Sequence, residues 1–173
     1  MFERAAATAS ALARSVGADQ LGLATPCSEW DVAALLEHMA GGPAYMAAAL
    51  GADDPAVQTW PDVAAVEAVN ARLAEPGALD RRCISPAGFE WSVAEAAAGT
   101  AMDQLIHTWD LAVALGVDRT LDTELVDAVA AMFLPHMPEV GRQAGFVGAA
   151  VPVDATASTQ DVLLGAMGRD PRR

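Results

Sequence analysis

The chain has 173 residues, the size of one domain, and we expect a single domain over residues 1–173. Forty alanines, few aromatic residues and few β-branched runs favour an all-α fold. The formal net charge is −13 and all ten basic residues are arginine, so phosphate repulsion argues against nucleic acid and against an anionic membrane surface as partners.

The N-terminal half contains three predicted helices. The first covers residues 2–16. Ser28 is the predicted N-cap of the second, over residues 29–50, with an acidic capping-box partner at Asp31. The Gly-Gly-Pro stretch at residues 41–43 predicts a kink or an interruption in it.

A loop is expected over residues 51–61, followed by a third helix over residues 62–74 that ends before Pro76 and Gly77. Residues 77–91 show no strict apolar–polar alternation. This stretch is therefore expected to be irregular, or at most a short extended segment.

The fourth helix has the clearest boundaries. Ser92 and Glu95 form a capping box at its start, and Gly116 follows its last apolar residues. A fifth helix begins after Asp122 and ends before Pro135 or Pro138.

Residues 141–158 are expected to be a loop, and a short helix over residues 159–167 closes the chain. Four long helices joined by loops predict a four-helix bundle. Such bundles build metal and cofactor sites from inward-facing side chains on facing helices.

The fourth helix carries two ionisable residues on an apolar face, Asp103 and His107. Their spacing of four places both side chains on the same side of the helix. His38 lies beside the apolar stripe of the second helix and would meet them if the two helices face each other. Two imidazoles and one carboxylate can hold a divalent metal with a coordination position left open. The alternative is a helix-stabilising ion pair beside a core histidine.

Four other side chains are candidates for a functional role. Asp110 can hold the second ring nitrogen of His107, or lie on the surface as an ordinary acid. Cys27 stands just before the second helix, whose positive end favours a thiolate, although a packed thiol is the preferred interpretation. Tyr45 either lines a pocket or packs. His136, between two prolines, is interpreted as a plain loop residue.

Localisation follows from what the chain lacks. No signal pattern stands at its start and no uninterrupted apolar stretch approaches the length of a membrane span. Cys27 and Cys83 are its only cysteines and have no CxxC spacing. We therefore expect a cytoplasmic protein whose two thiols stay reduced.

Two segments resemble a known family. TPCSEWDVAALLEHMAGG resembles the TPCxxWxxxxLLxH segment of the mycothiol-dependent maleylpyruvate isomerase N-terminal family, in the DinB-like superfamily. DQLIHTWDLAVALG is similar to the D/E-xxx-H-x-WDLAxAxG segment of the same family. The tail TQDVLLGAMGRDP resembles the end of a single-domain actinobacterial branch described as metal-binding. The resemblance extends over nearly the whole chain.

This resemblance implies a DinB-like four-helix bundle with a short additional C-terminal helix. It also implies one divalent metal ion on His38, Asp103 and His107, with zinc expected and nickel, iron or cobalt as alternatives. The resemblance further implies a low-molecular-weight thiol as cofactor, such as mycothiol or bacillithiol. The family's isomerase has glutamate at the position of Asp103 and a second domain for which 173 residues leave no room. Maleylpyruvate isomerisation itself is therefore not expected.

Three functions stay open on the sequence alone. The first is a metal- and thiol-dependent transferase or isomerase acting on a small electrophilic substrate. The second is a hydrolase that uses a metal-activated water. The third is a non-enzymatic bundle that binds a metal or small ligand, with alanine-rich helices suited to a homodimer. A water-accessible cleft over the three ligands would favour an enzyme. Arg81 and Arg82 are candidates for binding the carboxylate of a thiol cofactor.

Overall fold

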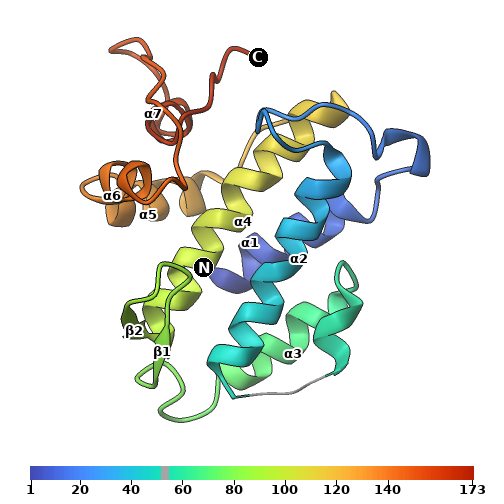
Figure 1. The fold of residues 1–173 in the computed structure, drawn as a ribbon, viewed down its shortest axis with the longest axis vertical. Helices are drawn as coiled ribbons and strands as arrows, with labels where there is room; N and C mark the ends of the chain where they lie inside the picture. Colours follow the sequence, from blue (N-terminus) through green and yellow to red (C-terminus); the bar gives the residue numbers. More distant parts are fainter. Residues whose placement is uncertain (52–54) are drawn as a thin grey trace. The chain divides into compact units, whose positions relative to one another are not determined.

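The computed structural model describes residues 1–51 and 55–173, which form two compact units, Met1–Arg119 and Thr120–Arg173. The described residues contain seven α-helices and one two-stranded sheet (Figure 1). The fold predicted to be all-α is thus mostly helical, with a small sheet in addition. The single domain over residues 1–173 stays a prediction, and the two units are described separately.

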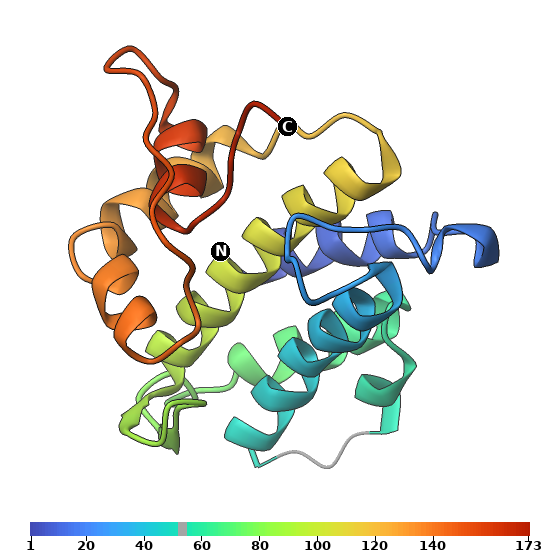
Figure 2. The same ribbon diagram turned by 45° about the horizontal axis from the view of Figure 1, so that its top comes forward.

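Four helices form most of the first unit: α1 (Phe2–Ala13), α2 (Val32–Ala49), α3 (Val63–Leu73) and α4 (Val93–Leu115). Helix α4 packs against α1 and α2, and α3 packs against the same two helices. Figure 1 and Figure 2 both show α4 running through this unit beside α2. Ala9 and Ala13 of α1 join Leu35 and Met39 of α2 and Leu111 of α4 in a buried core, where the small alanines allow close approach.

The start of α2 differs from the prediction. The N-cap is Asp31, whose carboxylate accepts a hydrogen bond from the Ala34 N–H at 2.9 Å, so the cap predicted at Ser28 is wrong. The reason is the turn that precedes the helix. An isolated bridge pairs Ala24 with Asp31, and the Thr25 hydroxyl donates to the Trp30 carbonyl at 2.8 Å. These contacts hold the preceding residues in a turn until Asp31.

Helix α2 continues without interruption through its Gly-Gly-Pro stretch, so the predicted interruption does not occur. Pro43 has no N–H to donate to the carbonyl of Met39, four residues earlier. The side-chain amide of Gln104 on α4 donates to that carbonyl instead, at 2.8 Å. A Cβ at residue 42 would lie only 2.8 Å from the Gln104 Nε2, so Gly42 is what allows this approach.

The connection between α3 and α4 contains a hairpin. Strand β1 (Arg82–Ile84) pairs antiparallel with β2 (Glu90–Ser92). Of the two predictions for residues 77–91, irregular or short extended structure, the structure shows the second. Helix α3 starts after its N-cap Asp62, as predicted. The loop expected over residues 51–61 contains a 3-10 segment at Pro55–Thr59, and residues 52–54 of it lie outside the described residues.

Helix α4 has the predicted ends. Ser92 accepts from the Glu95 N–H, and the Glu95 carboxylate accepts from the Ser92 N–H at 2.7 Å. Gly116 follows the helix with φ 66°, a left-handed conformation that favours glycine. Helix α1, by contrast, ends at Ala13, three residues earlier than predicted.

The second unit holds α5 (Thr123–Phe133), α6 (Met137–Gln143) and α7 (Thr159–Ala166), and α5 packs against α7. Helices α5 and α7 confirm the prediction. Helix α6 was not predicted, because Pro138 was interpreted as a terminator. Pro138 lies in the first turn of α6, where the N–H that proline lacks would have no helical partner. Among the described residues, no helix combines the length and apolar character needed to cross a membrane.

Candidate metal centre

The packing of α2 against α4 brings the three predicted ligands together within the first unit. The Oδ1 of Asp103 lies 3.2 Å from the Nε2 of His38 and 3.4 Å from the Nε2 of His107. One donor atom from each residue falls within a group whose members are all less than 4.8 Å apart. Helix periodicity places Asp103 and His107 side by side, and the facing helix adds His38.

The donor set fits a divalent metal. Zinc bonds to nitrogen and oxygen ligands of about 2.0–2.1 Å in a tetrahedron separate the ligand atoms by about 3.3 Å, close to the two distances observed. Two imidazoles and a carboxylate are a borderline-soft set that suits zinc, nickel, iron or cobalt. A metal held here by three protein ligands retains a position for a further ligand.

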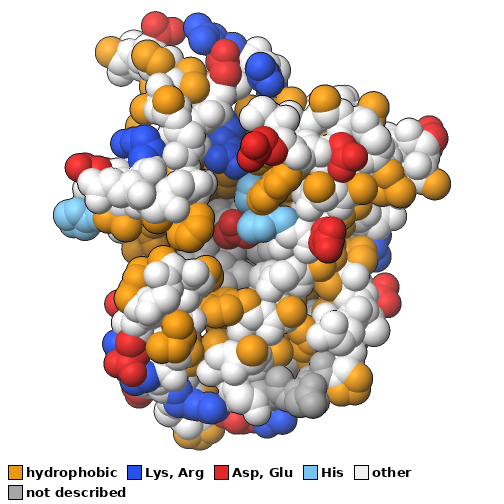
Figure 3. All heavy atoms as spheres, viewed as in Figure 1, with side chains coloured by type: hydrophobic (Ala, Val, Ile, Leu, Met, Phe, Trp, Pro, Cys, Tyr) orange, Lys and Arg blue, Asp and Glu red, His pale blue; other side chains and the backbone are white. Residues whose placement is uncertain are grey.

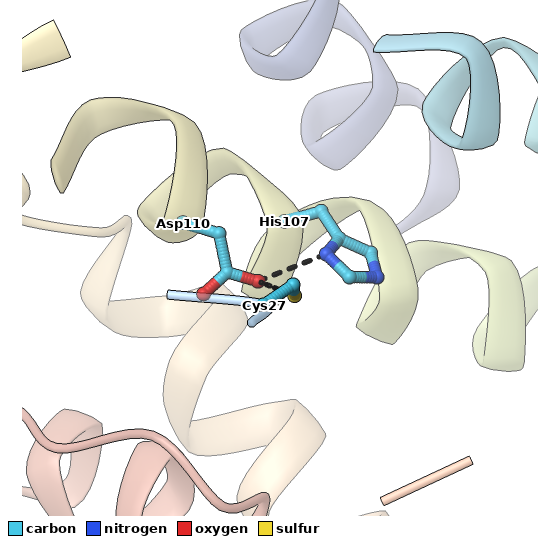
Figure 4. A group of neighbouring side chains, drawn as sticks. All are labelled: Cys27, His107 and Asp110. Carbon is cyan, nitrogen blue, oxygen red and sulfur yellow. Dashed lines mark hydrogen bonds and ion pairs between the residues drawn. The ribbon is translucent and has the colours of Figure 1, made fainter. Parts of the chain in front are cut away.

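Asp110 orients the ring of His107. Its Oδ2 accepts a hydrogen bond from the His107 Nδ1 at 2.9 Å (Figure 4). Asp110 is fully buried, so it is not a surface acid. A histidine that donates its Nδ1 proton to a carboxylate presents its Nε2 in a fixed direction as the metal-binding nitrogen. Here that direction is toward Asp103.

Cys27 contacts the same carboxylate. Its thiol donates a hydrogen bond to the Oδ2 of Asp110 at 3.4 Å (Figure 4). Cys27, His107 and Asp110 thus form a second group of potential ligands. This group would use the Nδ1 of His107 and consists of half-buried or fully buried side chains, so it offers less access for substrate than the first. Sequence reasoning missed this contact because it spans 83 residues of the chain.

The site is electrostatically coupled. Burial alone would raise the pKa of Asp103, but hydrogen bonds and charge from His107 and His38 outweigh it and lower that pKa. Burial alone would lower the pKa of His107, but Asp103 first, then Asp110 and Cys27, raise it well above the usual value. Without a metal, these contacts favour the protonated ring of His107, with Asp110 beside one ring nitrogen and Asp103 beside the other.

The indole of Trp30 covers the two imidazoles. Its ring centroid lies 4.6 Å from that of His38 and 5.6 Å from that of His107. The other side is open, because the side chains of His38 and Asp103 are 38% and 35% exposed. Figure 3 shows histidine atoms at the surface beside carboxylate and hydrophobic side chains. The three side chains thus have one apolar wall, formed by Trp30, and one face accessible to solvent.

The remaining candidates lie elsewhere. Tyr45 lines a cavity at the end of α2, together with Arg81 and Arg82. His136 precedes α6 in the second unit and belongs to neither ligand group formed by the described residues. Cys27 is five residues ahead of α2, since that helix begins at Val32, so it does not stand at the positive end of the helix.

Comparison with known proteins adds a family. Residues 2–83 are similar to the mycothiol maleylpyruvate isomerase N-terminal domain, a stretch that includes His38 and stops before Asp103 and His107. Two uncharacterized proteins of Mycobacterium tuberculosis, from strains CDC 1551 and H37Rv, are each 39% identical over 131 residues. Each alignment covers 71% of this chain and 70% of the relative. No solved structure matches the chain significantly.

Proposed function

Because the chain belongs to the family of the mycothiol maleylpyruvate isomerase N-terminal domain, we propose that it is a metal-dependent enzyme that uses a low-molecular-weight thiol such as mycothiol. Its ligands would be His38, Asp103 and His107, its metal zinc, and its substrate a small electrophile. The reaction would be thiol transfer or a thiol-assisted isomerisation. The first unit would then be a DinB-like four-helix bundle built from α1–α4.

One observation carries this proposal. Two imidazole nitrogens, one from α2 and one from α4, lie 3.2 and 3.4 Å from the same carboxylate oxygen of Asp103, and all three atoms are of the types that zinc prefers. An ordinary ion pair on α4 needs only Asp103 and His107. An ion pair has no need of the second imidazole or of the hydrogen bond from His107 to buried Asp110, whereas both are common in metal sites.

Each residue around the proposed metal has its own role. A divalent metal bound here supplies a Lewis acid that lowers the pKa of a thiol placed next to it. Asp110 holds His107 so that its Nε2 faces the site, and Trp30 shields the imidazoles from water on one side. The open face between His38 and Asp103 admits the thiol and its electrophile. The thiol of Cys27 donates a hydrogen bond to Asp110. This favours a small-molecule thiol, and not Cys27, as the nucleophile.

The accessible face also bears on the alternatives. A purely structural metal site is closed, with all ligands from the protein, whereas catalytic sites keep an open position. With His38 and Asp103 each more than one third exposed, the geometry favours an enzyme over a non-enzymatic metal-binding bundle. Hydrolysis by a metal-activated water would use the same ligands, and only an activity assay separates it from thiol transfer.

The proposal is tested first by metal content. We expect about one zinc ion per chain in untagged protein analysed by mass spectrometry, as for a mononuclear site. The double variant His38→Ala/His107→Ala should lose it. His136→Ala removes the third histidine, which lies outside both ligand groups, and should keep it. Zinc retained by the double variant, or none taken up by the wild type, would overturn the proposal.

Activity forms the second test. Mycothiol conjugation to monochlorobimane can be followed by fluorescence with the wild type, with the chelated protein and with His107→Ala. We expect turnover that chelation removes and zinc restores, and none in the variant. Hydrolysis of ester probes without any thiol would instead identify the site as hydrolytic.

A further inference from the structure

A second site of the first unit lies at the opposite end of α2 from its N-cap. A cavity of ≈ 410 Å³ is lined there by the last turns of α2 and by residues 81–84 of the hairpin. This volume falls within the range of small-molecule sites, about 300–1,000 Å³. Tyr45, which lines the cavity, is seven residues from His38, or about 10 Å along the helix, so the cavity is separate from the metal centre.

Arg81 supplies a fixed positive charge to this cavity. One of its guanidinium nitrogens donates to the carbonyl of Leu50, which ends α2, at 2.7 Å. Gly51 follows with φ 64°, and a Cβ there would lie 3.0 Å from the second terminal nitrogen. The guanidinium is thus anchored over the helix end. No carboxylate among the described residues pairs with it, so its other N–H donors can bind an anion.

Arg82 behaves differently, although it lines the same cavity. It donates to the Glu90 carboxylate at 3.3 Å and lies 3.9 Å from a carboxylate oxygen of Glu95. Its charge is compensated within the protein. Arg81 therefore provides the local positive potential in a chain whose formal net charge is −13.

The cavity also contains a thiol. Cys83 lies on β1, is partly exposed and forms no disulfide within the described chain. The Tyr45 hydroxyl lies 3.8 Å from its Sγ, accepts from the Trp91 indole at 2.7 Å and donates to the Ile84 carbonyl at 3.0 Å. Burial raises the pKa of Tyr45 to about 12, so the phenol stays uncharged and adds no negative charge beside the thiol.

We infer that this cavity is a site of thiol–disulfide exchange at Cys83, selective for small disulfides that carry a carboxylate. Arg81 binds the carboxylate and places the disulfide against the sulfur of Cys83. The Cys83 thiolate attacks one sulfur, a new S–S bond forms and the original S–S bond breaks. The departing thiolate takes up the proton that Cys83 gave up. The products are a mixed disulfide on the protein and one free thiol, and the incoming disulfide is the only oxidant.

Charge selectivity provides the test, and it does not rest on the proposed metal function. Two disulfides release coloured thiols: anionic 5,5′-dithiobis(2-nitrobenzoate) and neutral 2,2′-dithiodipyridine. Rates are measured for each on the native chain and divided by the rates for N-acetylcysteine amide. Cys83→Ser supplies the background from Cys27. We expect the anionic probe to be preferred at Cys83, although the acidic chain as a whole repels it.

The decisive comparison uses two arginine variants. Arg81→Met should lower the anionic rate by about tenfold, the effect of losing one charge-assisted hydrogen bond, and leave the neutral rate unchanged. Arg14→Met is the matched control, since Arg14 also donates to a backbone carbonyl, that of Pro61. It should change neither rate. An unchanged neutral rate also shows that Arg81→Met still folds.

Two results would overturn the inference. One is equal loss of the anionic rate in Arg81→Met and Arg14→Met, which would mean that only net charge matters. The other is peptide mass spectrometry that finds the mixed disulfide on Cys27 and not on Cys83.

Discussion

Replacing Asp110 with asparagine tests the metal centre without touching a proposed ligand. The Nδ1 of His107 lies 2.9 Å from the Oδ2 of a carboxylate that is fully buried. Asparagine keeps a hydrogen-bond acceptor of the same shape but loses the charge. Charged hydrogen bonds contribute about 1.5–3 kcal/mol and neutral ones about 0.5–1.5, so the loss is about 1–1.5 kcal/mol, or roughly tenfold in zinc affinity.

The pH of the assay decides how much of this loss is visible. The charge of Asp110 stabilises the protonated ring of His107 as well as the metal-bound ring, and protons compete with zinc for the Nε2. Removing the charge weakens both states, so the two effects partly cancel at neutral pH. We therefore expect a larger loss at pH 9 than at pH 7, measured by competition with a chromophoric chelator in buffered zinc. Asp127→Asn, at an exposed position of the second unit, is the matched control.

The same titration distinguishes the two ligand groups. If zinc is held by the group that includes Cys27, Asp110 is a direct ligand. Asp110→Asn and Cys27→Ser should then each abolish zinc binding. Asp103→Asn would then have little effect. If zinc is held as we propose, Asp103→Asn abolishes binding and Asp110→Asn only weakens it. An unchanged dissociation constant for Asp110→Asn at pH 9 would refute the role assigned to that carboxylate.

Three further outcomes are expected. Because its neighbours raise the pKa of His107, zinc must displace a proton at pH 7, so affinity falls as pH decreases, and calorimetry in buffers of different ionisation heat should detect about one proton released per ion. Gly42→Ala should lower the free energy of unfolding in urea by about 1–3 kcal/mol, because its Cβ would lie 2.8 Å from a side-chain amide of α4, whereas Gly41→Ala, with open space around its Cβ, should cost nothing. Asp31→Ala should cost about 1 kcal/mol in the same assay as the loss of an N-cap, and Ser28→Ala should be neutral; the reverse order would contradict the observed start of α2.

Local signals predicted the helices whose ends depend on a few neighbouring residues. Ser92, Glu95 and Gly116 define α4 by side-chain and backbone chemistry within one turn, and the structure confirms all three. The start of α2 failed because Ser28 and Asp31 are both good caps. The choice between them depends on the bridge from Ala24 to Asp31, which capping rules do not take into account.

In the candidate site, too, the contacts within one helix could be predicted from the sequence. The spacing of Asp103 and His107 places them together by helix geometry alone, and the structure brings His38 to them as the sequence anticipated. Asp110 follows from a spacing of three on the same helix. The contact of Cys27 with Asp110 joins two distant segments, and only the folded chain reveals it.

Beside His38 and Asp103, the hydrogen bonding inside α2 departs from the usual helical pattern. Pro43 leaves the carbonyl of Met39 without its helical partner, and Gln104 donates to that carbonyl across the interface. Met39 and Gln104 are the residues directly after His38 and Asp103, so this hydrogen bond ties α2 to α4 beside the proposed ligands. A proline that sequence rules treat as a break thus makes room for a contact between the two helices next to the candidate site. Gly42→Ala, which disturbs the same contact, should therefore weaken zinc binding as well as stability, although residue 42 touches no ligand.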